Sequence, residues 1–287
     1  MPHVALLLGG FEVTPLCDGW APLPLADECP GRTVNWHGER QRHPWAFVDE
    51  ERWAWHVHSF LIRNEGSLVL VDTGIGHLDR SPFDVTTRID EELVSMGVDA
   101  SDIGTVVHTH LHADHAGGAC LPDGSPRFPN AVHHVHPEDW EFFAEADDPE
   151  DFNGRASMMR LWELGVLDLD PTDHEVAHGV SLVHSPGHTP GHRSVLVGHR
   201  DAVLLLTGDL LHVPPQVAHP EWTSGHDVEP QVACAHRERL LHMARDEAWH
   251  VGVSHFGRPF GRVGRDGWLG EEEDPGRTAD AGGPQTG

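Results

Sequence analysis

The stretch VVHTHLHADHAGG, residues 106–118, concentrates side chains that bind metal ions or transfer protons. Its core is the pattern His-x-His-x-Asp-His, with ligand-type residues at positions 110, 112, 114 and 115. Neutral imidazole is the commonest metal ligand in proteins, and a carboxylate adds the hard oxygen that suits a hydrolytic centre. These side chains would repel and desolvate one another in the absence of a cation. We therefore expect a metal-binding loop rather than a solvated polar turn.

Ligand-type residues also follow other apolar segments. His188 lies in the Pro/Gly turn of HSPGHTPGH, Asp209 ends LLLTGD, and His255 ends VGVSH. A carboxylate at the end of a buried strand costs free energy unless it is paired or bound to a metal. Four strand ends thus deliver ligand-type residues, as one edge of a β-sandwich would.

Apolar runs of strand length must position these residues. The predicted strands cover 3–13, 53–63, 67–74, 103–110, 131–136, 180–187, 193–198, 202–209 and 249–256. The predicted helices cover 81–97, 136–146, 152–165 and 230–246. Strands come first and are then mixed with helices, an order that favours a layered α/β sandwich over a simple alternating parallel fold.

One domain is expected to span residues 1–264. Residues 14–52 are rich in Pro, Trp and charge, which predicts a long and partly irregular excursion. Residues 265–287 hold mainly Gly, Glu, Asp and Pro, and we expect this tail to be disordered. The first apolar run lacks a basic region and a cleavage site, so we interpret it as a strand and not as a signal peptide.

The charge of the chain excludes some partners. The 46 acidic residues outnumber the 19 basic ones, which gives a formal net charge of −27. Such a field repels nucleic acid and anionic membranes, and there is no apolar run long enough for a membrane span. The four cysteines are scattered without a C-x-x-C pair, so a reducing cytoplasm fits best. Cys120, near the motif, is interpreted as a small buried residue.

The order of these motifs resembles the metallo-β-lactamase superfamily, in particular its N-acyl-homoserine lactonase and methyl-parathion-hydrolase-like branch. The resemblance covers roughly residues 4–260 and includes VDTG before the histidine motif. It implies a four-layer αββα sandwich with the active site at one edge of the β-sandwich. The implied ligands, in order, are His110, His112, Asp114, His115, His188, Asp209 and His255.

The resemblance also implies how these residues share two divalent cations. His110, His112 and His188 would hold one ion, Asp114, His115 and His255 the other, and Asp209 would bridge them. Zn²⁺ is the default metal, although such ligands also accept Mn²⁺, Fe²⁺ or Co²⁺.

Two further residues receive roles beside these ligands. Asp72 in VDTG is expected either to orient the ligand loop through hydrogen bonds or to act only as a turn acid. The lactonases carry a tyrosine three residues after the bridging aspartate, whereas this chain has no tyrosine and places His212 there. We expect His212 to face the substrate oxyanion or leaving group; the alternative is a surface histidine.

The implied reaction is hydrolysis of a lactone or related ester by a hydroxide shared between the metals, with Asp114 as proton acceptor and donor. The alternatives are a phosphotriester hydrolase, a thioesterase, an iron-dependent persulfide dioxygenase or a binding module with a dead site. A small-molecule ester is the expected partner, and a homodimer is left open. Candidate residues for an apolar acyl pocket are Met158, Met159, Trp162, Trp222 and Phe256.

Overall fold

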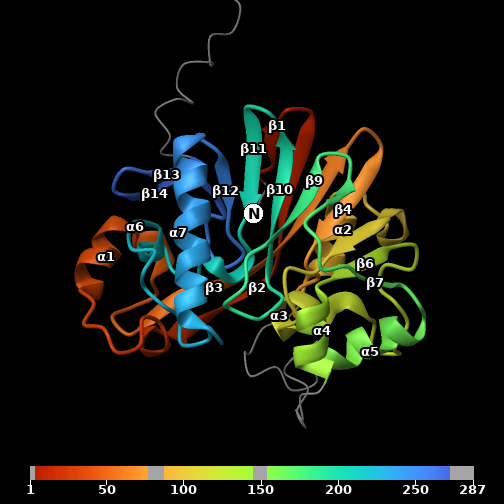
Figure 1. Ribbon diagram of the computed structural model, residues 1–287, viewed down its shortest axis with the longest axis horizontal. Coiled ribbons are helices and arrows are strands. Elements are labelled where there is room, and N and C mark those ends of the chain that lie inside the picture. Colours follow the sequence, from red (N-terminus) through yellow and green to blue (C-terminus); the bar gives the residue numbers. More distant parts are fainter. Residues whose placement is uncertain (1–3, 77–86, 145–153, 272–287) are drawn as a thin grey trace, which may run out of the picture.

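Two seven-stranded sheets face each other in the computed structural model, which describes residues 4–76, 87–144 and 154–271 (Figure 1). The first sheet contains β1 (Leu6–Leu8), β2 (Phe11–Pro24), β3 (Arg52–Asn64), β4 (Ser67–Val71), β5 (Thr105–Val107), β6 (Val132–Val135) and β7 (Leu167–Leu169). The second contains β8 (Glu175–Ala177), β9 (Val180–His184), β10 (Arg193–His199), β11 (Ala202–Leu206), β12 (His250–Gly252), β13 (Phe260–Gly264) and β14 (Gly267–Gly270). Both sheets contain parallel and antiparallel pairs. The parallel pairs are β4–β5, β5–β6 and β6–β7 in the first sheet and β11–β12 in the second.

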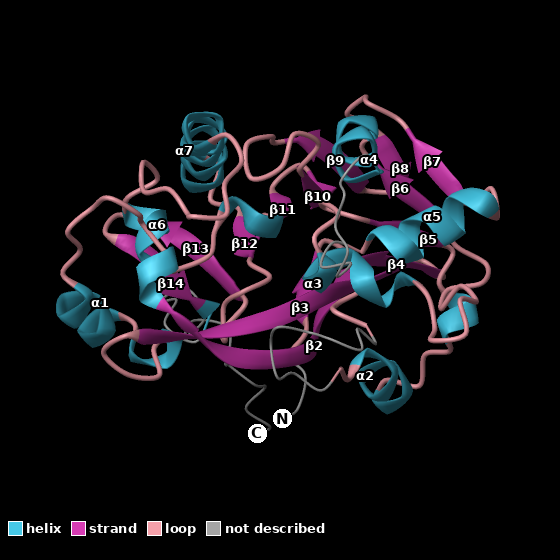
Figure 2. Cartoon of the chain, turned by 90° about the horizontal axis from the view of Figure 1, so that it is seen from below, coloured by secondary structure: helices cyan, strands magenta, loops and turns pink. Residues whose placement is uncertain are grey.

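Helices cover the outer faces of the sheets, as Figure 2 shows for α2 and α7. The helices are α1 (Trp36–Arg42), α2 (Ile89–Ser95), α3 (Ala113–Ala116), α4 (Pro137–Ala144), α5 (Arg155–Glu163), α6 (Pro215–Ala218) and α7 (Pro230–Asp246). Leu93 of α2 packs with Leu61 of the first sheet, and Leu240 of α7 packs with Val251 of the second. The predicted four-layer αββα sandwich is therefore confirmed.

The main hydrophobic core lies between the two sheets. Phe60, Val71 and Val107 of the first sheet meet Leu182 and Leu206 of the second, and all are at most 1% exposed. Burial of this apolar surface is the dominant stabilising contribution to such a sandwich. It also fixes the ends of β5 and β11, from which the ligand loops emerge.

Several predicted boundaries need correction. The first predicted strand is a hairpin, because Gly9 and Gly10 adopt positive φ angles of 56° and 92° and turn the chain between β1 and β2. Residues 14–52 are more regular than expected: β2 runs through Pro24 and pairs with β3, and α1 follows. The predicted helix over 81–97 is observed as α2, and its residues 81–86 lie outside the described ranges.

The C-terminal boundary at residue 264 is too early. β14 pairs with β13, and Trp268 is 4% exposed and packs with Phe256 in the core beneath α7. One large aromatic side chain therefore anchors a segment that its composition predicted to be disordered. Residues 272–287 lie outside the described ranges. By contrast, the predicted helix over 230–246 is confirmed at both ends.

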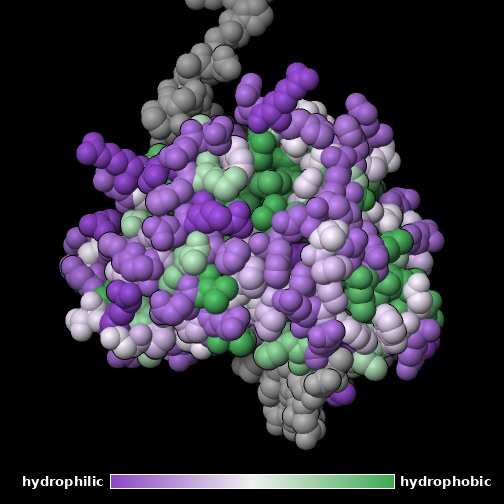
Figure 3. Space-filling view, viewed as in Figure 1, coloured by the Kyte–Doolittle hydropathy of each residue, from purple (hydrophilic) through white to green (hydrophobic). Residues whose placement is uncertain are grey.

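The surface matches the acidic composition. Hydrophilic side chains cover most of the face in Figure 3, and apolar ones gather in small groups. Among the described residues no helix is long and apolar enough to cross a membrane.

Candidate metal centre

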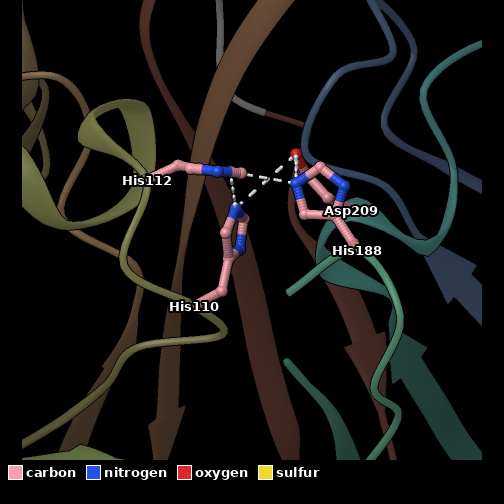
Figure 4. Close-up of side chains that lie close together, drawn as sticks. All are labelled: His110, His112, His188 and Asp209. Carbon is pink, nitrogen blue, oxygen red and sulfur yellow. Dashed lines mark hydrogen bonds and ion pairs between the residues drawn. The ribbon is translucent and has the colours of Figure 1, made fainter. Parts of the chain in front are cut away.

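The loop after β5, the turn after β9 and the segment after β11 bring four side chains together (Figure 4). His112 Nδ1 lies 2.9 Å from His110 Nε2 and 3.0 Å from His188 Nε2. Asp209, which follows β11, places its Oδ2 3.4 Å from His188 Nε2 and 3.8 Å from His110 Nε2. Three imidazole nitrogens and a carboxylate oxygen thus converge on one point.

Asp209 also belongs to a second cluster. Its Oδ1 lies 3.1 Å from His115 Nε2 and 3.0 Å from His255 Nε2. Asp114 Oδ2 lies 3.2 Å from His115 Nε2 and 3.6 Å from His255 Nε2. The structure therefore brings all seven predicted ligands together as two groups that share Asp209.

Hydrogen bonds on the outer side orient the imidazoles. His115 Nδ1 lies 2.8 Å from Asp72 Oδ2, and His255 Nδ1 donates to the carbonyl oxygen of His56 at 2.7 Å. His188 Nδ1 lies 3.2 Å from Asp227 Oδ1. A ring nitrogen that donates a proton outward leaves the lone pair of the other nitrogen pointing inward, the arrangement usual for metal-binding histidines.

The inner atoms fit divalent cations. His112 Nδ1 lies close to ring nitrogens of both His110 and His188, and a single N–H between each pair leaves at least one lone pair directed at the same point. His115 Nε2 and Asp209 Oδ1 are buried, and although they lie 3.1 Å apart neither makes a well-oriented hydrogen bond. Buried polar atoms are rarely left unsatisfied, and a cation would satisfy both of these.

Asp72 occupies a strained backbone position. Its φ is +62°, a left-handed conformation uncommon for residues other than glycine, and such strain is concentrated at functional sites. From there its carboxylate accepts hydrogen bonds from the backbone N–H and hydroxyl of Thr109 as well as facing His115. Of the two expected roles, the geometry supports orientation of the ligand loop.

Tight packing holds that loop against the segment after β4. A Cβ added at Gly118 would overlap the carbonyl oxygen of Thr73, and one at Gly117 would overlap that of Ile75. The Thr73 hydroxyl and N–H both donate to the carbonyl oxygen of His115. The absence of side chains at the two glycines therefore allows this close approach.

Two acids of the site were missed in the sequence. Asp139 of α4 is 1% exposed and accepts hydrogen bonds from Leu111 N–H (3.2 Å), the Thr189 hydroxyl (3.0 Å) and Gly191 N–H (2.6 Å). Burial raises its pKa to about 7, although these donors oppose the shift. Asp227, the partner of His188, lies in GHDVEP. Neither acid belongs to a recognisable spacing, so only the three-dimensional arrangement reveals them.

His212 is not a surface histidine. It is 4% exposed, and its Nε2 lies 3.4 Å from Asp209 Oδ2 while its buried Nδ1 has no hydrogen-bond partner. Burial lowers its pKa, but Asp209, Glu28 and Asp227 outweigh that effect and raise the pKa to about 9. Glu28 is itself 4% exposed and has an unpartnered buried oxygen, and nothing in the sequence marked it.

The predicted apolar pocket is wrong in part. Met158 and Phe256 are each 1% exposed and pack in separate cores, Met158 with Leu161 beside the histidine loop and Phe256 with Trp268. Trp162 is half exposed and stacks on Trp140, and Trp222 stacks on His219 at 4.3 Å. Met159 is half-buried on α5. Met158 and Phe256 are therefore core residues of different hydrophobic clusters.

Comparison with known proteins agrees with this site. Residues 52–255 match the family model described as the metallo-beta-lactamase superfamily. An N-acyl homoserine lactonase AttM of Azorhizobium caulinodans is 34% identical over 129 residues, which cover 41% of this chain but only 45% of that relative. An N-acyl homoserine lactonase of a Bacillus species is 28% identical over 216 residues, covering 69% of this chain and 80% of the relative.

Solved structures share the fold. A dizinc quorum-quenching lactonase, AidC, in complex with a product superposes with a TM-score of 0.81 at 21% identity, covering 94% of this chain and 97% of AidC. The hydrolase AbOPH of the beta lactamase superfamily gives a TM-score of 0.80 at 19% identity over 93% and 97% of the two chains. The two-sheet architecture is therefore one that metal-dependent hydrolases use.

Proposed function

Because this chain belongs to the metallo-beta-lactamase superfamily, we propose that its histidine and aspartate centre hydrolyses a lactone or a related ester. The observation that carries this proposal is the pair of ligand groups joined by Asp209. The N-acyl homoserine lactonases among its relatives suggest acyl homoserine lactones as the first substrates to test.

The ligand set suits two cations, with Zn²⁺ the first choice for imidazole and carboxylate ligands. His110, His112 and His188 would hold one ion, Asp114, His115 and His255 would hold the other, and Asp209 would contact both. When bound, such ions supply Lewis acidity that lowers the pKa of water and polarises a carbonyl oxygen.

Asp114 is the proposed proton acceptor. Its side chain is 14% exposed, against 5% for Asp209 and 1% for His115 and His255. Among these groups it is therefore the carboxylate that water and substrate reach most easily. A carboxylate at the open side of the centre can take the proton that the attacking water loses and return it to the leaving alcohol.

His212 is the proposed donor to the substrate oxygen. It lies beside the centre, stacked on the ring of His255 at 5.7 Å, and its turn is fixed by Gln216, whose side-chain oxygen accepts from the N–H groups of His212 and Val213. The negative charges of Asp209 and Glu28 favour the protonated ring. A fixed imidazolium can stabilise developing negative charge on the leaving oxygen.

Metal analysis combined with a pH-stat screen tests this function. The purified protein should contain at least two metal ions per chain, and it should hydrolyse acyl homoserine lactones faster than phosphotriesters or thioesters. Chelation should abolish the activity, and Zn²⁺ should restore it. His110→Ala should remove metal and activity together, whereas His219→Ala, an exposed control, should change neither. Turnover that survives chelation, or is confined to phosphotriesters, would contradict the proposal.

A further inference from the structure

A second cluster of metal-ligand side chains lies on β2 and β3. Cys17, His56 and His58 place a sulfur and two ring nitrogens within 4.8 Å of one another. Cys17 Sγ lies 3.8 Å from His56 Nδ1, and the rings of His56 and His58 stack at 5.6 Å with 9° between their planes. None of these residues belongs to the seven-ligand centre, which contains no cysteine.

Strand pairing places these residues together, beside a β-bulge in β2. Cys17 pairs with His58 across the two strands, but the register shifts between Cys17 and Gly19, so that Trp20 faces His56. The bulge adds one residue to β2, and bulges of this kind redirect side chains. His56 and His58 share one face of β3 because side chains alternate along a strand. Cys17 is thereby brought near both rings.

The tautomer of His58 leaves a ligand atom free. Its Nδ1 lies 3.0 Å from the carbonyl oxygen of Ser254, which can only accept, so Nδ1 must carry the proton. The lone pair of Nε2 is then available for a cation. An imidazole that donates one N–H to a backbone carbonyl is the usual form of a metal-binding histidine.

We propose that Cys17, His56 and His58 form a third metal site, which holds a thiophilic divalent cation of the Zn²⁺ type. One thiolate and two neutral imidazoles are ligands that Zn²⁺ and Co²⁺ accept, with water free to complete a tetrahedral shell. The site shares no ligand with the proposed hydrolytic centre, and its test does not depend on that centre's substrate.

The charges around the cluster agree with cation uptake. Burial lowers the pKa of His56 to about 4 and that of His58 to about 3, so both rings are neutral near pH 7. Burial also raises the pKa of Cys17 to about 11, with a further contribution from Glu92 and Asp18 that is opposed by Arg88. Metal binding would therefore release one proton from the thiol.

The site adjoins the loop that carries His255. His58 contacts the carbonyl oxygen of Ser254 through both its backbone N–H and Nδ1, each at 3.0 Å. The carbonyl oxygen of His56 accepts from His255 Nδ1. A cation that fixes His56 and His58 would hold β3 against this loop, so its role is structural support of the adjacent centre.

Cobalt spectroscopy tests the proposal without measuring activity. Apoprotein is titrated with Co²⁺, and the near-ultraviolet thiolate-to-Co²⁺ charge-transfer band is recorded together with bound metal per chain. A band should appear, because Cys17 supplies a thiolate that the His/Asp centre lacks. Cys17→Ala should lose the band and one bound ion, whereas Cys120→Ala and Cys234→Ala, matched thiol controls, should keep both.

Three outcomes would overturn the proposal. They are a missing band at saturating Co²⁺, a band that persists in Cys17→Ala, and a band that disappears instead with Cys120 or Cys234. If Cys17→Ala does not fold, His56→Gln serves as the second variant, because it removes a ligand and keeps the thiol. It should also lose one bound ion and weaken the charge-transfer band. A shortage of ions in the His/Asp centre would contradict the hydrolase without affecting the charge-transfer band.

Discussion

Each imidazole of the candidate metal centre has one nitrogen that faces the proposed cation and one that faces away from it. A group that accepts a proton from the second nitrogen leaves the lone pair of the first available for the metal. Asp72 faces His115, Asp227 faces His188, and a backbone carbonyl faces His255. Removal of such outer partners typically weakens metal binding about 10–100-fold. The buried outer groups are therefore part of the function even though they do not touch the cation positions.

Replacement of His212 tests its proposed role as donor. His212→Phe keeps the ring volume but removes the group beside Asp209, so kcat for a lactone should fall about 100-fold, the usual contribution of a positioned acid. Bound metal should remain unchanged, because the seven-ligand set is intact. Steady-state kinetics and metal analysis measure both. His219→Phe is the control, because the His219 side chain is 40% exposed; an unchanged kcat/KM in His212→Phe would refute the role.

The sequence predicted the ligand-type residues of the site, but not the acids that hold the ligand loops in place. The seven ligand-type residues stand in a fixed order at strand ends, and their chemistry is visible in their types. Asp139 and Asp227 are single acids among 46 acidic residues, and nothing in their spacing separates them from solvated ones. Their importance depends on burial and on the donors that they meet, which only the fold determines.

The helix α4 contacts both the loop that carries His110 and His112 and the turn that carries His188. Asp139 contacts the N–H of Leu111 between His110 and His112, and it also contacts Thr189 and Gly191 just after His188. One carboxylate thus fixes the separation of loops that are distant in the sequence. An element with no ligand of its own therefore determines the ligand geometry.

Asp139→Ala should weaken both the fold and the metal centre. Loss of the carboxylate leaves the buried donors of Leu111, Thr189 and Gly191 unpartnered, and each such group costs about 1–3 kcal/mol. We expect a lower free energy of unfolding in the apoprotein and faster loss of metal to a chelator in the holoprotein. Urea unfolding and a chelator-release assay measure these changes. The neighbouring exposed Glu138→Ala is the control, and equal behaviour of the two variants would contradict this role of α4.

The elements themselves were predictable where their patterns were strong. The predicted strands before the ligand loops are present as β5 and β11, but each is shorter than the apolar run because the last residues turn toward the site. The hairpin at Gly9 and Gly10 was missed because an apolar run continues through it. β14 was missed because one buried tryptophan in a polar segment carries little periodic signal.

Across the whole molecule, buried histidines couple stability to pH. Burial lowers the pKa of His133 and His56 to about 4 and that of His58 and His192 to about 3. The unfolded chain takes up these protons near pH 6.5, whereas the folded chain does not. Between about pH 6.5 and pH 4 the unfolded state therefore binds more protons at these four histidines, so their contribution to stability falls as the pH falls. The raised pKa of Asp139 acts in the opposite direction.

Urea unfolding of the apoprotein at pH 7.5, 6.5, 5.5 and 4.5 should reveal this loss. The contribution of these histidines to the free energy of unfolding should be largest above pH 6.5, and each should contribute a slope of up to about 1.4 kcal/mol per pH unit below it. His133 is remote from the proposed ligands and contacts His108, so His133→Asn should reduce the slope by one such contribution whatever its effect at pH 7.5. An unchanged slope in His133→Asn would show that the His133 ring is already protonated in the folded protein and would contradict its contribution to this pH dependence.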